Sequence, residues 1–166
     1  VWGGLVNPKL AVALTGRRGE ALEEYKKVIL ALNNKVVEEA PADLTINTHV
    51  CRGNYHSTFF SSGAYDGVAD LLFGEENVNA YYLEYDDERS GGFAPLAKIT
   101  GNKKVVLGLV TTKTPKLEDK QSVIARIKEA SKYVPLENLY LSPQCGFASC
   151  EIGNKLMEEE QWAKLK

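Results

Sequence analysis

The stretch KVVLGLVTTKTPKLEDKQSVIARIKEASKYVPLENLYLSPQ, residues 104–144, decides the fold class. It opens with an apolar run over 104–112, which is typical of a strand buried on both faces of a parallel sheet. An amphipathic segment over 117–134 predicts a helix, and a second short run over 137–144 predicts another strand. A strand, a helix and a strand in this order predict a βαβ unit with parallel strands.

The same alternation extends toward the N-terminus. Short runs rich in β-branched or aromatic residues predict strands, and apolar residues at three- and four-residue steps predict helices. The predicted elements before residue 104 are a helix over 22–36, a strand over 44–50, a helix over 63–74 and a strand over 78–86. A last helix is predicted from about Asn154 to the end. The order therefore indicates an α/β protein with a parallel sheet.

Two α/β architectures accommodate about four βα units. One is half of a (β/α)8 barrel, since a whole barrel typically needs about 250 residues. The other is a complete doubly wound sheet of four or five strands. The sequence of 166 residues begins without methionine and stops inside a predicted helix that has no C-cap glycine or proline. These ends favour the half barrel and a longer parent protein.

Composition and charge exclude several function classes. The chain is 44% hydrophobic and 25% charged, which is ordinary for one globular unit. A net charge of -2 gives no attraction for nucleic acid or an anionic membrane surface. No apolar run approaches the roughly 20 residues of a membrane-spanning helix, and no basic-then-apolar leader marks secretion. Three cysteines are too few, and odd in number, for a disulfide framework, so we expect a reducing cytoplasm.

Polar side chains with metal-binding chemistry fall at the C-terminal ends of the predicted strands. His49 and Cys51, in THVCRGNY (48–55), are two residues apart and face the same side. Glu84 is near the end of the next strand, and Cys145 follows the last one. Because parallel strands share their C-terminal edge, these four side chains can converge there. Imidazole, thiolate and carboxylate suit Zn²⁺, whereas a buried apolar cysteine and a satisfied core or surface histidine remain the alternative.

Three segments carry a family resemblance. INTHVCRGNY (46–55), YYLEYDDERSG (81–91) and LYLSPQCGFAS (139–149) resemble, in this order, motifs of the cobalamin-independent methionine synthases. They are closest to the shorter bacterial relatives of the C-terminal catalytic domain, and the resemblance extends from about Trp2 to Lys166. It implies a (β/α)8 barrel, of which residues 1–166 supply the C-terminal half as a single region. The N-terminal half would then lie outside this sequence.

The resemblance also implies a ligand set and a reaction. The family's catalytic zinc would be held by His49, Cys51, Glu84 and Cys145, while Cys150 matches no ligand position. In the family, the zinc binds the sulfur of homocysteine and favours its thiolate over the thiol, whose ordinary pKa is near 8.5. That thiolate takes the methyl group of a methyltetrahydrofolate, and methionine is formed. Homocysteine and methyltetrahydrofolate are therefore the expected small-molecule partners.

Two other functions remain open at this point. A related enzyme could use the same zinc-thiolate chemistry on another thiol or with another methyl donor. A catalytically inactive fragment could bind zinc only, and could require its missing half or associate with itself, because half a barrel exposes two sheet edges.

One departure from the family pattern concerns the methyl donor. Lys113, in TTKTP, stands where the full-length synthases carry a histidine that is proposed as a general acid. A lysine with an ordinary pKa near 10.4 is a much weaker acid at neutral pH. The alternative interpretation is a solvated lysine in a loop.

Residues next to the proposed ligands allow two interpretations each. The run DDERSG (86–91) is interpreted as a solvated loop, with Arg89 as a candidate partner of a carboxylate near the site. Arg52, Asn54 and Tyr55 could face a substrate, but a turn that requires Gly53 explains the same stretch.

Overall fold

The computed structural model describes residues 1–148 and 150–166. The helices are α1 (Trp2–Leu5), α2 (Pro8–Thr15), α3 (Glu20–Glu38), α4 (Ala69–Glu75), α5 (Lys120–Ala130) and α6 (Glu158–Leu165). The strands are β1 (Asn47–Val50), β2 (Ala80–Glu84), β3 (Lys104–Val110) and β4 (Leu139–Pro143). Within these residues, no helix is both long and apolar enough to cross a membrane.

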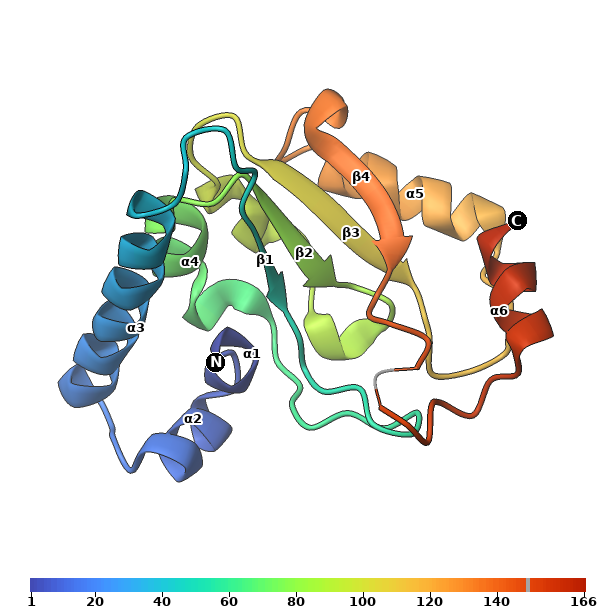
Figure 1. Ribbon diagram of the computed structural model, residues 1–166, viewed down its shortest axis with the longest axis horizontal. Helices are drawn as coiled ribbons and strands as arrows, with labels where there is room; N and C mark the ends of the chain where they lie inside the picture. Colours follow the sequence, from blue (N-terminus) through green and yellow to red (C-terminus); the bar gives the residue numbers. More distant parts are fainter. Residues whose placement is uncertain (149) are drawn as a thin grey trace.

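The described strands form one four-stranded parallel sheet in the order β1-β2-β3-β4 (Figure 1). A doubly wound sheet would reverse its strand order at a switch point, whereas here each strand lies beside the next one in sequence. This sequential order is that of a barrel wall. The structure therefore confirms the parallel α/β fold and decides against the doubly wound alternative.

One face of the sheet carries the core. Alternate strand residues point to opposite faces, and on the core face those of β2 and β3, with Val50 of β1, are buried against apolar residues of α4 and of the segment after α5. The core residues of this layer are Val50, Tyr81, Leu83, Val105, Leu107, Leu109, Leu72, Phe73 and Val134. In Figure 1, α3 and α4 lie on the β1 side of the sheet and α5 on the β4 side.

The opposite face of the sheet is partly open to solvent. Tyr82 and Tyr140 are 40% and 45% exposed, and His49 and Asn47 are exposed beside them. This is the face on which the alternation along the strand places His49. In a closed barrel such a face lines the interior, so its exposure matches part of a barrel wall.

Element boundaries differ from the predicted ones. Every strand is shorter than predicted, and the helix predicted over 63–74 begins with a 3₁₀ turn at Tyr65–Gly67 before α4. Helix α6 begins at Glu158 rather than near Asn154, because the Glu160 side chain accepts the Met157 N–H at 2.8 Å and sets the first turn. The Asn154 side chain instead accepts the Ser57 N–H at 2.9 Å and belongs to a loop contact.

The sequence prediction missed the first two helices. Signals for α2 are present, since Asn7 caps its first turn, Pro8 follows at the first helical position and Gly16 ends it with φ +68°. Helix α1 has four residues, too few to show a period, yet it buries Trp2 and Leu5. The Trp2 indole N–H donates to Glu76 Oε1 at 3.2 Å, which fixes α1 against the segment after α4.

Candidate metal centre

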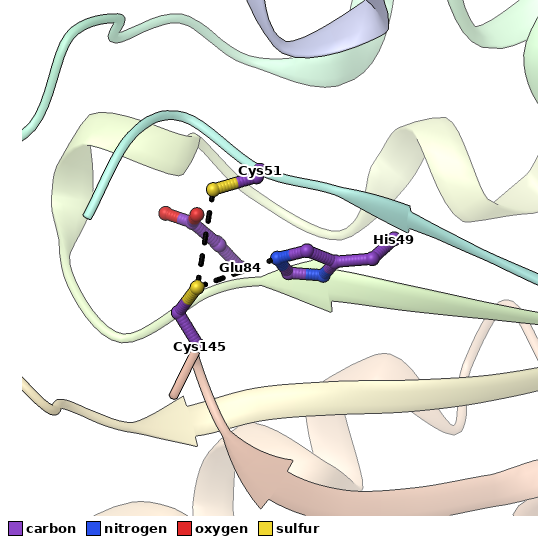
Figure 2. A group of neighbouring side chains, drawn as sticks. All are labelled: His49, Cys51, Glu84 and Cys145. Carbon is purple, nitrogen blue, oxygen red and sulfur yellow. Dashed lines mark hydrogen bonds between the residues drawn. The ribbon is translucent and has the colours of Figure 1, made fainter. Parts of the chain in front are cut away.

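The C-terminal ends of three strands bring the four predicted ligands together. His49 lies in β1, Cys51 directly after it, Glu84 ends β2 and Cys145 follows β4. One donor atom from each residue lies within 4.8 Å of all the others (Figure 2). The predicted convergence of these side chains is therefore present in the structure.

A glycine in β3 permits this approach across the sheet. Gly108 pairs in register with Glu84 on one side and Ser142 on the other. A Cβ atom at Gly108 would lie 2.7 Å from Gln144 Cα and 2.8 Å from Leu83 O. Strand β3 contributes no ligand. The absence of a side chain at Gly108 lets the chain before Cys145 lie close to the end of β2.

The His49 ring is oriented by a backbone carbonyl. Its Nδ1 lies 3.1 Å from Tyr82 O, and its Nε2 lies 3.7 Å from Cys145 Sγ (Figure 2). When Nδ1–H donates to the carbonyl, the lone pair of Nε2 points toward the cysteines. Metal-binding histidines commonly use this arrangement, because the second hydrogen bond fixes the tautomer and the ring plane.

The spacing of the donor atoms fits a tetrahedral zinc. Cys51 Sγ and Cys145 Sγ are 3.9 Å apart, and both thiols are free. Zn–S bonds of about 2.3 Å and Zn–N bonds of about 2.0–2.1 Å imply S···S and S···N edges of roughly 3.8 and 3.6 Å. The observed 3.9 and 3.7 Å are close to both edges. A disulfide would require the sulfurs about 2.05 Å apart.

Glu84 is fixed from both sides. The side chain is fully buried, its Oε1 accepts the Arg52 N–H at 2.8 Å, and its Oε2 accepts from Arg89 Nη2 at 3.0 Å. The guanidinium of Arg89 also pairs with Asp86 at 2.8 Å and with Asp87. The side chains of Asp86 and Arg89 are only 1% and 6% exposed, so the solvated-loop interpretation is wrong for them. Arg89 contacts a site carboxylate, as the other interpretation predicted.

Two of the neighbouring residues are structural. Arg52 is 1% exposed and points into the protein, which excludes the substrate-facing interpretation. The turn interpretation is supported at Gly53, which has φ +97° and whose Cβ would lie 2.6 Å from Phe60 N.

Lys113 is 7% exposed, so the interpretation as a solvated loop residue is wrong.

Mutual hydrogen bonding sets the protonation of the site. Donation by Cys51 and His49 lowers the pKa of Cys145. The hydrogen bond to Cys145 raises the pKa of Cys51, and burial adds to this effect. The hydrogen bond to Cys145 also raises the pKa of His49, against the effect of burial. The metal-free site therefore favours a Cys145 thiolate beside a Cys51 thiol, and it holds the proton of His49 more tightly than water does.

Zinc affinity should rise steeply with pH. A metal ion must displace the protons held on Cys51 and His49, whose pKa values are both raised. Below the His49 pKa two protons leave, so affinity should rise about 100-fold per pH unit, and above it about tenfold. Chelator competition across this range measures the slope. A pH-independent affinity would contradict the protonation pattern.

Gly3→Ala should disturb the site from the far end of the chain. A Cβ at Gly3 would lie 1.8 Å from Cys51 O, so helix α1 or the Cys51 backbone must move. We expect a loss of about 1–3 kcal/mol in the free energy of unfolding, together with weaker zinc binding. Denaturant unfolding and chelator competition measure the two effects. Gly92→Ala is the control, since no atom beyond its chain neighbours lies within 4 Å of its Cβ position, and equal effects in both variants would refute the clash.

Comparisons with known proteins agree with the geometry. The family described as "Cobalamin-independent synthase, Catalytic domain" matches residues 22–156. The uncharacterised protein YxjG of Bacillus subtilis is 48% identical over 89% of this chain and 39% of its own length. A methionine synthase of Pyrococcus horikoshii is 29% identical over 62% of this chain and 27% of its own.

A solved structure extends the agreement to the fold. A Listeria monocytogenes protein described as a candidate vitamin-B12-independent methionine synthase has a TM-score of 0.67 and 42% identity. The match covers 99% of this chain and 42% of that protein. The chain thus spans about two fifths of the length of the Bacillus subtilis and Listeria monocytogenes proteins. It belongs to the family of cobalamin-independent synthase catalytic domains.

Proposed function

We propose that this chain supplies the zinc-binding half of a methyltransferase that forms methionine. The reaction transfers a methyl group from a methyltetrahydrofolate-type donor to the sulfur of homocysteine. The observation that carries the proposal is the convergence of His49, Cys51, Glu84 and Cys145 within 4.8 Å at the C-terminal edge of the sheet. Active sites of (β/α)8 barrels lie at this edge, and the family membership supports the reaction class.

The residues around the site have separate tasks in this proposal. A zinc ion bound here would favour the thiolate form of a substrate thiol. Tyr82 O orients the imidazole of His49, and Arg52 and Arg89 hold the carboxylate of Glu84. A hollow of about 320 Å³ borders His49 and Cys145 and gives a small thiol room to approach the donor atoms.

The proposal is tested first by measuring the zinc content of the chain and then by assaying methyl transfer. Purified chain, loaded with excess metal and dialysed, should retain about one zinc. Because the chain spans about two fifths of its relatives, methyl transfer is then assayed with the chain alone and with the remaining barrel segment of a relative added. Labelled methyl groups should appear in methionine. A folded chain that retains no zinc would overturn the proposal.

Another thiol or methyl donor is the second candidate. Lys113 favours this candidate, because it stands where the family's proposed general acid would be. Its ammonium is buried and bound to three acceptors of the protein, so it does not replace that acid directly. Parallel assays with homocysteine and other thiols, and with methyltetrahydrofolate and other methyl donors, separate the candidates. The free thiols at the site suit a reducing compartment, so we propose a cytoplasmic location.

The isolated chain should associate with itself or with its missing half. Tyr82 and Tyr140 on the open face are exposed, and so is Leu141 in β4. Among the described strands, β1 and β4 each pair on one side only. Such edges and faces promote pairing between chains. Size-exclusion chromatography should therefore show a dimer or larger species, and a stable monomer at high concentration would contradict this expectation.

A further inference from the structure

Lys113 binds a single hairpin with its whole ammonium group. Residues 52–61, here called the 52–61 hairpin, fold back so that Arg52 O accepts the N–H groups of Phe60 and Ser61 at 2.8 and 2.9 Å. Lys113 Nζ donates to Gly53 O, Asn54 Oδ1 and Thr58 O at 3.1, 3.0 and 3.1 Å. An ammonium has three protons, so these three acceptors engage all of them.

The tip of the 52–61 hairpin has an unfavourable backbone conformation. His56 and Ser57 have φ values of +44° and +64°, in the left-handed region that non-glycine residues rarely adopt. Such residues persist when the surroundings hold them, at a cost of order 1–3 kcal/mol each. Lys113 supplies a buried cation that binds acceptors on both sides of this tip, Gly53 O before it and Thr58 O after it.

One route leads from Lys113 to Cys51. The carbonyl of Gly53 accepts from Lys113, and the N–H of Gly53 donates to Cys51 Sγ at 3.3 Å. By holding the Gly53 carbonyl, Lys113 fixes the turn at Gly53. The N–H of the same residue points at the sulfur of Cys51. Such hydrogen bonds favour the thiolate that a metal binds.

A second route leads to Cys145. Asn54 Oδ1 accepts from Lys113 Nζ and from Asn154 Nδ2, both at 3.0 Å. Asn54 Nδ2 donates to Gly146 O at 2.6 Å, directly after Cys145. The loop after β4 is therefore tied to the 52–61 hairpin, and through it to the same ammonium.

We propose that Lys113 is a positioning residue that orients Cys51 and Cys145 for metal binding through the two peptide groups that flank Gly53 and through the Asn54 side chain. The inference rests on the proposed zinc site. Donation of a proton to a substrate would require Lys113 to leave one of its three acceptors, and the burial of the side chain opposes that movement. A positioning role requires no such movement, because Lys113 keeps all three of its hydrogen bonds.

Zinc affinity of Lys113→Met tests the proposal. Chelator competition on the full chain should show affinity about 10–100-fold weaker than wild type, the range for partners that orient metal ligands. Hydrogen exchange at the Phe60 and Ser61 amides should accelerate in the same variant. The control is Lys103→Met, because Lys103 is also partly buried and its Nζ donates to Phe73 O and Thr100 Oγ1, both at 3.3 Å. It should lose stability and keep wild-type zinc affinity.

Asn54→Leu provides a second measurement. It keeps the ammonium with two of its three acceptors, but removes the tie to Gly146, so zinc affinity should again fall. Wild-type affinity in folded Lys113→Met would overturn the proposal. If Lys113→Met fails to fold, wild-type affinity in Asn54→Leu overturns it instead. Absence of zinc from the folded wild-type chain would overturn the proposed function, which is a separate and distinguishable result.

Discussion

Cys145→Ala is expected to weaken zinc binding by roughly 10²–10³-fold. Structural zinc sites bind with about 10–16 kcal/mol at neutral pH, which is roughly 2.5–4 kcal/mol for each of four ligands, and each 1.4 kcal/mol is a factor of ten. Cys145 should lie at the upper end of this range. Its sulfur is the atom that both Cys51 Sγ and His49 Nε2 approach, at 3.9 and 3.7 Å.

The matched control for this variant is Cys150→Ala. Cys150 is also a free, partly buried cysteine near the end of the chain, and it does not belong to the cluster of donor atoms. It should retain about one zinc per chain, as wild type does. His49→Ala should resemble Cys145→Ala, since it removes the only imidazole of the cluster. Equal zinc content in Cys145→Ala and Cys150→Ala, measured by elemental analysis, would show that the metal binds elsewhere or not at all.

The convergence of the ligands was predictable from two periodic rules. Alternation along a strand places His49 and Cys51 on one face, and parallel strands end at a common edge, which brings in Glu84 and Cys145. Neither rule depends on the exact ends of the strands. The convergence of the four side chains was therefore predicted correctly, although all four strands are shorter than predicted.

Contacts between distant loops were not predictable in this way. Gly3 lies against the Cys51 carbonyl, and Lys113 reaches the 52–61 hairpin, across separations of dozens of residues. No local period encodes such contacts, because they depend on how loops fold after the sheet has formed. The glycine at 108 had a readable signal, since a glycine inside a strand often marks a close approach of backbones.

Helix α3 shows where periodicity misleads. Val28, Leu32 and Val36 are among the apolar residues at three- and four-residue steps that predict this helix, but they are 55%, 58% and 70% exposed. The buried face instead contains Leu30 and Lys26, whose Nζ donates to Gly67 O at 2.8 Å. Apolar residues occupy two faces of this helix, and a period alone does not decide which of them faces the core.

Arg52→Met is expected to cost about 2–4 kcal/mol in the free energy of unfolding. The Arg52 guanidinium lies 4.1 Å from the ring centre of Tyr65 and donates to Tyr65 Oη and Gly63 O, both at 2.7 Å. Hydrogen bonds from a charged donor contribute roughly 1.5–3 kcal/mol each. Arg52→Met also removes a buried charge, and the desolvation free energy that is regained offsets part of this loss. Gly63 O, however, loses the Arg52 donor.

Arg52→Met should weaken metal binding as well as the stability of the fold. The backbone N–H of Arg52 binds Glu84 Oε1 at 2.8 Å, and its side chain fixes the chain directly after Cys51. Denaturant unfolding with and without zinc should therefore show a larger deficit when the metal is bound. Arg17→Met is the control, because Arg17 also stacks on a tyrosine, Tyr25 at 4.8 Å, but lies on the surface, where such changes stay within about 0.5 kcal/mol. Equal stability of the two variants would mean that the buried arginine contributes only packing, and that Glu84 keeps its orientation without it.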